Sequence, residues 1–374
     1  MKISTLLSQY SFHLVGKVTV GCWLFFSSAC TEAQQPKNSG DLYFPPKESS
    51  VWDETNYQSL NWDGTALAEL LSWLPTQDTR AFIILKDGKI VVEEYWGDKL
   101  TGLGPMDQNS FWYWASAGKT LTASLVGLAQ EKNLLSIKDR TQEYLGSGWT
   151  SLENSQEREI LILHQLSMTT GLDDGVANQD NTDPASLVFK SEAGTRWAYH
   201  NAPYTLLDKV LEKATGMKLQ AFFEENLGSK IGMSGMWQKT GENQVFYSNA
   251  RSMARFGLLL LANGKWDGER FWKSGYFEDL YSSSQDLNNS YGYLTWLNGK
   301  SSYMVPQSQM VFPGSLIPQA PSDMYQAMGK NGQFLMVIPS QNMVVVRMGG
   351  APGDLAVPFL LIRDIWDRLG PVIQ

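Results

Sequence analysis

The order of strand and helix patterns along the chain is the feature that most constrains its fold. Residues 81–96 (AFIILKDGKIVVEEYW) contain two β-rich runs around Asp87-Gly88, a pair that tolerates the positive φ of a hairpin turn. Further strand patterns lie near the other end of the chain, at 291–297, 333–339 and 342–348. Strands at both ends of a chain are joined most simply in one antiparallel sheet, with the residues between them inserted as a separate region.

The region between these strands has helical periodicity. A helix after residue 118 carries an apolar face made of Leu121, Leu125, Leu128 and Ala129. Other helices are predicted at 66–74, 160–166, 204–214, 250–262 and 353–369. Gly216 and Asn263-Gly264 are typical helix stops, and Pro358 is tolerated near the start of the last helix.

These patterns predict an α/β (α+β) fold for residues 41–370. The antiparallel sheet part covers about 41–115 and 285–370 and is flanked by helices, and the inserted, mostly helical part covers about 116–284. A chain of 374 residues with 43% hydrophobic residues has enough apolar material for such a core. The net charge of −8, with no basic block, argues against nucleic acid as a partner.

The first forty residues resemble an export signal followed by a tether. Residues 1–29 contain two lysines, no acid and a short apolar stretch that ends in small residues, which is the layout of a signal peptide. Cys30 follows Ser27-Ser28-Ala29 and resembles a bacterial lipid-attachment site, although Ser27 stands where Leu is usual. Residues 30–40 are polar and predict a flexible tether. We expect an exported, periplasmic lipoprotein held at the membrane through Cys30; an ordinary cleaved signal and an uncleaved anchor are the alternatives.

Scarce residue types exclude several chemistries. Beyond residue 30 the chain keeps only His164 and His200 and has no cysteine. It therefore cannot form a cysteine-rich zinc site, an iron–sulfur cluster or a three-histidine metal site, and we expect no metal and no cofactor. His164, in ILILHQL, is predicted to be a packed helix residue, and no G-x-S-x-G elbow is present. Enzymatic chemistry is thus left to Ser, Lys, Tyr, carboxylates or one of the two histidines, of which His200 lies next to Tyr199 and could face either way.

The first candidate for such chemistry is Ser116-Ala117-Gly118-Lys119, where an aromatic stretch gives way to an apolar helix. Ser116 and Lys119 share one face of the first helical turn. Backbone N–H groups at a helix N-terminus favour a nucleophilic oxygen and its oxyanion, and a lysine neutralised by burial can accept the serine proton. Chance gives roughly one S-x-x-K in a chain of this composition, so an N-cap serine followed by a solvated lysine is the alternative.

Two further motifs are candidates. Tyr-x-Asn occurs at Tyr199-His200-Asn201 and at Tyr247-Ser248-Asn249, and near a lysine such a phenol can relay a proton while the amide orients it. Either Asn can equally cap the following helix, and composition does not choose between the tyrosines. The turn 329–333 (GKNGQ) presents Lys330, although a hairpin turn with an exposed lysine explains it as well.

The segment around Ser116 also carries a wider likeness. Residues 116–145 (SAGKTLTASLVGLAQEKNLLSIKDRTQEYL) resemble the nucleophile helix of the serine β-lactamase-related family. The likeness continues in order through 160–172, 193–217, 250–271 and 291–297, and covers residues 40–370. That family includes class C β-lactamases, D-alanyl-D-alanine peptidases, carboxylesterases and 6-aminohexanoate-dimer hydrolases.

The resemblance implies roles for particular residues. Ser116 would be the nucleophile, Lys119 its base partner, and Tyr199, which lies in the family's tyrosine segment, the proton relay. Asn201, Lys330 and Gly332 are candidate substrate-binding residues. The turn 329–333 looks more like the G-x-G-G-Q turn of the 6-aminohexanoate-dimer hydrolases than the Lys-Thr-Gly of penicillin-recognising members, which favours a small amide or ester over a β-lactam.

We therefore expect a secreted serine hydrolase that cleaves a small-molecule amide or ester through an acyl-enzyme on Ser116, as a monomer or dimer. Within enzymes, the alternative is a β-lactamase or a D-alanyl-D-alanine carboxypeptidase. Outside enzymes, the alternative is a non-catalytic envelope lipoprotein that binds ligands in the same cleft.

Overall fold

The computed structural model of the chain describes residues 42–273, 275–352 and 358–374. The predicted signal peptide (1–29), the tether (30–40) and Cys30 lie outside these residues. The described helices are α1 (Gly64–Trp73), α2 (Gly118–Glu131), α3 (Gln142–Leu145), α4 (Asn154–Glu157), α5 (Ile162–Leu166), α6 (Asn201–Thr205), α7 (Leu207–Thr215), α8 (Leu219–Phe223), α9 (Ser229–Ile231), α10 (Ala250–Leu261), α11 (Tyr276–Leu280) and α12 (Phe359–Ile373). The described strands are β1 (Thr79–Lys86), β2 (Lys89–Tyr95), β3 (Trp112–Tyr113), β4 (Met236–Thr240), β5 (Asn243–Ser248), β6 (Lys265–Trp266), β7 (Glu269–Arg270), β8 (Trp296–Leu297), β9 (Ser302–Tyr303), β10 (Phe312–Pro313), β11 (Tyr325–Gly329), β12 (Gln333–Ile338) and β13 (Met343–Gly349).

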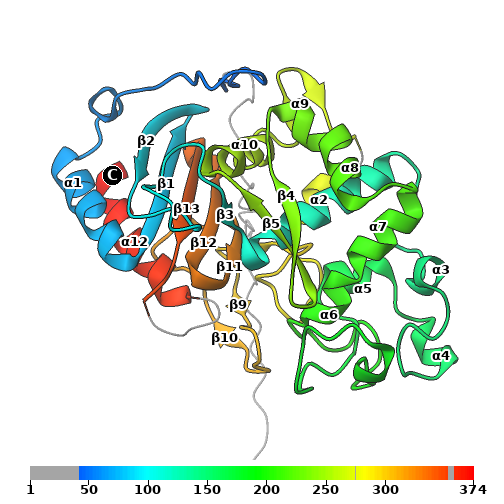
Figure 1. Ribbon diagram of the computed structural model, residues 1–374. Coiled ribbons are helices and arrows are strands. Elements are labelled where there is room, and N and C mark those ends of the chain that lie inside the picture. Colours follow the sequence, from blue (N-terminus) through cyan, green and yellow to red (C-terminus); the bar gives the residue numbers. More distant parts are fainter. Residues whose placement is uncertain (1–41, 274, 353–357) are drawn as a thin grey trace, which may run out of the picture. The chain divides into compact units, whose positions relative to one another are not determined.

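The main sheet joins strands from both ends of the chain, as predicted (Figure 1). β1 and β2 form the expected hairpin, and Asp87 and Gly88 at its turn have φ values of 50° and 83°. β1 also pairs with β13, which gives a six-stranded sheet in the order β2-β1-β13-β12-β11-β8. All neighbouring strands in it are antiparallel. The predicted fold class is therefore confirmed.

Helices cover the central strands of this sheet. α10 packs against β1, β12 and β13, while α1 packs against α12 beside the sheet (Figure 1). Every residue of β12 and β13 is buried, which is typical of strands covered on both faces. The last helix starts later than predicted, because Pro358 has a non-helical backbone (φ −83°, ψ 71°) and α12 begins at Phe359. Residues 353–357 of that prediction lie outside the described part.

The structure adds a hairpin that the sequence analysis did not predict, and it shortens one expected strand. The mostly helical region also contains the hairpin of β4 and β5, and β5 pairs with β3. β4 has no buried residue, so no alternating apolar pattern marks it. The strand expected at 291–297 is limited to β8, because Leu294 has a left-handed backbone (φ 49°) that interrupts it.

None of the described helices is long and apolar enough to cross a membrane.

Candidate active site

Ser116 lies on a short 3-10 turn, η4 (Ala115–Ala117), directly before α2. The buried Trp114 anchors this turn on β5, since its backbone N–H donates to the Phe246 carbonyl oxygen over 2.8 Å and its Nε1 donates to Ser248 Oγ over 2.8 Å. Ala115, which follows, has a φ of 47°, a conformation that costs free energy in a residue other than glycine. A strained residue thus precedes Ser116, and the aromatic stretch before it holds the backbone in place.

The end of β11 packs directly against this turn. A Cβ atom added to Gly329 would overlap the Trp114 carbonyl oxygen and would lie 2.9 Å from Ala117 N and 3.1 Å from Ser116 N. Only glycine therefore permits this approach of two backbones. The sequence placed a candidate turn here, but it singled out Lys330 and Gly332 and missed Gly329.

Lys119 lies in the first turn of α2 and is 3% exposed. Its Nζ donates a hydrogen bond to Ser116 Oγ over 2.9 Å. Burial lowers the pKa of Lys119 to about 7, and the negative charge of Asp180 opposes this shift. The N-cap of α2 is Ala117, which makes no side-chain capping bond. A capping serine followed by a solvated lysine therefore does not describe this pair.

Two tyrosine rings enclose the Lys119 ammonium group. Its Nζ lies 5.1 Å from the ring centroid of Tyr199 and 4.2 Å from that of Tyr204. Tyr199 is buried; burial raises its pKa, and the interaction of its hydroxyl with the Ser116 side chain partly offsets the rise. Ser116, Lys119 and Tyr199 are thus brought together. Tyr204 was not predicted at the site, because its place there depends on how α6 packs against α2.

The second Tyr-x-Asn motif lies elsewhere. Tyr247 is in β5 opposite Tyr113, with 6.3 Å between their ring centroids. Asn249 caps α10, since its Oδ1 accepts from the backbone N–H of Ser252 over 2.8 Å. This is the capping function that the sequence left open for both asparagines.

Asn201 connects the tyrosine segment to a loop that the sequence did not single out. Its Nδ2 donates to Asp180 Oδ1 over 2.8 Å, and its own Oδ1 is buried with no hydrogen-bond partner among the described residues. Asp180 is also the group whose charge raises the pKa of Lys119. Nothing in the sequence marked Asp180, because its nearness to Lys119 arises from the folding of a loop rather than from spacing.

The remaining candidates have different surroundings. Lys330 is exposed. Gly332 (φ 76°) is buried against Arg347 and Leu361, and its carbonyl oxygen accepts from Arg347 Nη1 over 2.9 Å. The Nδ2 of Asn331, between them, donates to the Tyr113 hydroxyl over 2.7 Å. Of the residues in this turn, Gly329 is the one that packs directly against the backbone around Ser116.

The two histidines are also placed. His164 lies in α5, as predicted, and its Nδ1 accepts from the backbone N–H of Leu161 over 3.1 Å. His200 is 2% exposed, and burial lowers its pKa to about 4. Neither ring nitrogen of His200 has a hydrogen-bond partner in the described part of the chain. Within the same residues, no cluster of three or more His, Cys, Asp or Glu is arranged to hold a metal ion.

An antiparallel sheet with an inserted helical region, and a serine–lysine pair where the two meet, defines the class of β-lactamase and transpeptidase-like folds. The chain belongs to the Beta-lactamase family, whose model matches residues 78–353. Members of this family are generally serine hydrolases. The resemblance noted in the sequence is therefore confirmed at the level of the family.

Individual relatives are distant. An uncharacterised protein of Alkalihalophilus pseudofirmus is 24% identical over 293 residues, which are 71% of this chain and 81% of the relative. Penicillin-binding protein 4* of Bacillus subtilis is 28% identical over 152 residues, 36% of this chain and 32% of its own length. The match thus spans about a third of that relative.

Solved structures share the fold over most of the chain. A proposed 6-aminohexanoate-dimer hydrolase from Bacillus anthracis has a TM-score of 0.66 and 18% identity, covering 89% of this chain and 92% of its own. A family VIII carboxylesterase has a TM-score of 0.61 and 14% identity, and the match covers 81% of this chain and 96% of the carboxylesterase chain. At these identities the likeness establishes the fold.

Proposed function

We propose that the chain is a secreted serine hydrolase that cleaves a small amide or ester through an acyl-enzyme on Ser116. The observation that carries this proposal is the 2.9 Å contact between Lys119 Nζ and Ser116 Oγ, made by a lysine that is 3% exposed. A lysine whose pKa is lowered to about 7 is partly neutral near neutral pH and can accept the serine proton. Membership of a family of hydrolases supports the same reaction class.

The reaction runs in two halves. In the first, Ser116 Oγ forms a bond to the substrate carbonyl carbon while its proton passes to Lys119 Nζ. The proton then reaches the leaving amine or alcohol through the Tyr199 hydroxyl as the scissile bond breaks. In the second half, water attacks the acyl carbon, its proton follows the reverse route to Ser116 Oγ, and the acid leaves.

The backbone N–H of Ser116 forms part of the oxyanion hole in this proposal. Its direction is fixed before substrate arrives, since Trp114 is bonded to β5 and Gly329 packs against the same turn. A donor that is already oriented stabilises developing negative charge without reorganisation in the transition state. Ala115 and Gly329 thus support catalysis through the backbone rather than through side chains.

The test is covalent labelling of Ser116. The protein is treated with a fluorophosphonate or with a labelled penicillin, and the adduct is located by peptide mass spectrometry, with Ser116→Ala as the control. We expect one adduct, on Ser116, and turnover of p-nitrophenyl esters or short amides. Absence of both adduct and turnover would leave the non-catalytic binding protein as the better account and would overturn the proposal.

A substrate panel decides between a small amide or ester and the penicillin-related alternatives. It compares p-nitrophenyl esters, short amides, a chromogenic cephalosporin and D-alanyl-D-alanine peptides. The turn that bears the exposed Lys330 favours the first two, because it does not contain Lys-Thr-Gly. Higher kcat/KM for the cephalosporin or the D-alanyl peptide would favour the alternative, in keeping with the partial likeness to penicillin-binding protein 4*.

Export and membrane attachment are part of the proposal and rest on the sequence of residues 1–40. A lipid on Cys30 would hold the catalytic region at the periplasmic side of a bacterial membrane. We expect Cys30→Ser to move the protein from the membrane fraction to the soluble fraction after cell lysis. Unchanged fractionation of this variant would remove the lipid anchor from the proposal.

A further inference from the structure

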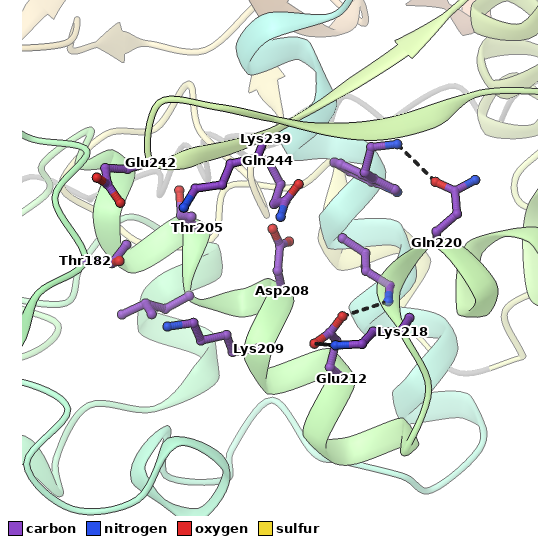
Figure 2. Close-up of a pocket in the computed structure, with 13 residues that line it drawn as sticks. Thr182, Thr205, Asp208, Lys209, Glu212, Lys218, Gln220, Lys239, Glu242 and Gln244 are labelled. Carbon is purple, nitrogen blue, oxygen red and sulfur yellow. Dashed lines mark hydrogen bonds and ion pairs between the residues drawn. The ribbon is translucent and has the colours of Figure 1, made fainter.

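A pocket of about 440 Å³ lies between α7, the start of α8 and the β4–β5 hairpin (Figure 2). Its lining includes Asp208, Lys209 and Glu212 from α7 and Trp237 and Lys239 from β4. Ser116, Lys119 and Tyr199 are not among its lining residues. Its volume is within the range of sites for small molecules. It is therefore a separate cavity, and nothing in the proposed hydrolysis uses it.

Asp208 is the unusual group in this pocket. It is 8% exposed, and its carboxylate points into the cavity toward the side chains of Lys239 and Gln244 (Figure 2). Its Oδ1 has no hydrogen-bond partner among the residues that the structure describes. Burial, with the nearby charge of Glu212 second, raises the pKa of Asp208 well above its usual range. Burial without a partner favours the neutral form of this carboxyl group, so a ligand that brings a positive charge next to it stabilises the ionised form and pairs with it.

The second inward carboxylate is already occupied. Glu212 accepts from Lys218 Nζ and from the backbone N–H of Leu219, each over 3.3 Å. Besides Asp208 and the bonded Glu212, the carboxylate that lines the pocket is the exposed Glu242, and no cluster of three or more His, Cys, Asp or Glu among the described residues is arranged to hold a metal ion. A metal ion is therefore a poor occupant, and an organic cation fits better.

Trp237 supplies an aromatic wall of the same pocket. Its backbone N–H donates to Gln220 Oε1 over 3.0 Å, and its ring packs on Phe246 with 5.0 Å between centroids. Both contacts fix the indole where it lines the cavity. A carboxylate and a fixed indole that line one pocket are a combination that binds organic ammonium groups, through an ion pair and through the aromatic face.

Lysines at the mouth of the pocket indicate a second charge on the ligand. Lys209 and Lys239 are exposed, and neither forms an ion pair with a described acidic residue. We propose that this pocket binds a small zwitterion, the size of an amino acid or dipeptide, with its ammonium group on Asp208 beside Trp237 and its carboxylate at Lys209 or Lys239. This binding is independent of the proposed hydrolysis.

Isothermal titration of the full chain with three matched probes tests the proposal. The probes are L-norvaline, butylamine, which lacks the carboxylate, and pentanoate, which lacks the ammonium group. We expect L-norvaline to bind with a millimolar Kd, butylamine several-fold more weakly, and pentanoate not measurably. Pentanoate binding as tightly as L-norvaline, or no binding of any probe at 50 mM, overturns the proposal.

Variants locate the binding. Asp208→Asn, an isosteric change, should weaken L-norvaline binding at least tenfold while its melting curve stays cooperative. Glu242→Gln, at an exposed rim carboxylate, should change the affinity less than twofold. Ser116→Ala should leave it unchanged, which separates this pocket from the candidate active site. Wild-type affinity in Asp208→Asn, or loss of binding in Ser116→Ala, would show that the ligand binds elsewhere.

Discussion

The Nζ atom of Lys119 lies 2.9 Å from Ser116 Oγ, in a place from which solvent is almost excluded. The two residues are one helical turn apart, so local geometry alone brings them near each other. Burial then determines what the contact can do. A solvated ammonium group would only donate to the serine, whereas a lysine with a pKa of about 7 can also accept its proton.

The first prediction concerns the pH dependence of hydrolysis. Lys119 must be neutral to accept a proton, and it becomes neutral as the pH rises through its pKa. We therefore expect kcat/KM for a p-nitrophenyl ester to rise about tenfold per pH unit below pH 7 and to level off above it. A stopped-flow or steady-state profile from pH 5 to 9 measures this. A profile that is flat through pH 7 would falsify the role of Lys119 as the base.

The second prediction concerns Asp180, whose charge raises the pKa of Lys119 and whose Oδ1 accepts from Asn201. Asp180→Asn removes the charge, so the rising limb of the pH profile should move to lower pH. Asp183→Asn is the matched control, because Asp183 lies in the same loop, is exposed, and its side chain accepts from the local backbone N–H of Ala185. An equal shift in both variants, or none in Asp180→Asn, would contradict an electrostatic effect of Asp180 on Lys119.

Beyond the sheet that joins both ends of the chain, the parts of the fold that the sequence predicted are set by local patterns. The hairpin at Asp87-Gly88 and the helix stop at Gly216 follow from backbone preferences at single positions. The strand expected at 291–297 failed because Leu294 adopts a positive φ that no local preference predicts. Its N–H donates to the Leu166 carbonyl oxygen over 2.9 Å and its carbonyl accepts from Thr120 Oγ1 over 2.8 Å, so tertiary contacts set it.

The candidate site divides in the same way. Ser116 and Lys119 were found from spacing, and Tyr199 was chosen over Tyr247 through resemblance to a family. Gly329 and Asp180 were missed, because each lies far from Ser116 in the sequence and reaches the site only when the sheet and the loop are folded. Sequence patterns thus predicted the groups proposed to react. The structure added Gly329, which packs against the Ser116 turn, and Asp180, which affects the pKa of Lys119.

The third prediction separates the two tyrosines. Tyr199→Phe removes the hydroxyl that interacts with the Ser116 side chain but keeps the ring stacked on Trp296, so the protein should fold and kcat should fall about 10²–10³-fold. Tyr247→Phe changes a residue paired with Tyr113 and should leave kcat within about threefold of wild type. Kinetics on one ester, with melting temperatures of both variants, test this. Loss of activity only in Tyr247→Phe would show that Tyr199 is not the proton relay and that Tyr247 is the better candidate.

The fourth prediction concerns the cost of the buried lysine. The pKa of Lys119 is lower in the folded chain than in the unfolded chain. Below about pH 10 the unfolded chain therefore binds a proton that the folded chain does not bind, which lowers the free energy of unfolding. This loss of stability grows as the pH falls and reaches its full size below about pH 7. Lys119→Met should abolish hydrolysis and yet stabilise the protein at pH 7 by on the order of 2–4 kcal/mol, less whatever the contacts to Ser116 and Tyr204 contribute. Urea unfolding at pH 7 and pH 10 measures the difference, which should shrink at the higher pH. A gain that does not depend on pH would point to packing instead.

The fifth prediction concerns the backbone contact between Gly329 and the Ser116 turn. A methyl group at position 329 would meet the Trp114 carbonyl oxygen and the backbone nitrogens of Ala117 and Ser116, so Gly329→Ala must push the turn away from β11. We expect kcat to fall about 10²-fold with a smaller change in KM, because displacing an oxyanion donor affects the transition state more than the bound substrate. Gly370→Ala in α12 is the control: apart from its chain neighbours, nothing lies within 4 Å of its added methyl group, so it should not affect kcat. Wild-type kcat in Gly329→Ala would mean that the turn tolerates the displacement and that its exact position does not govern the reaction.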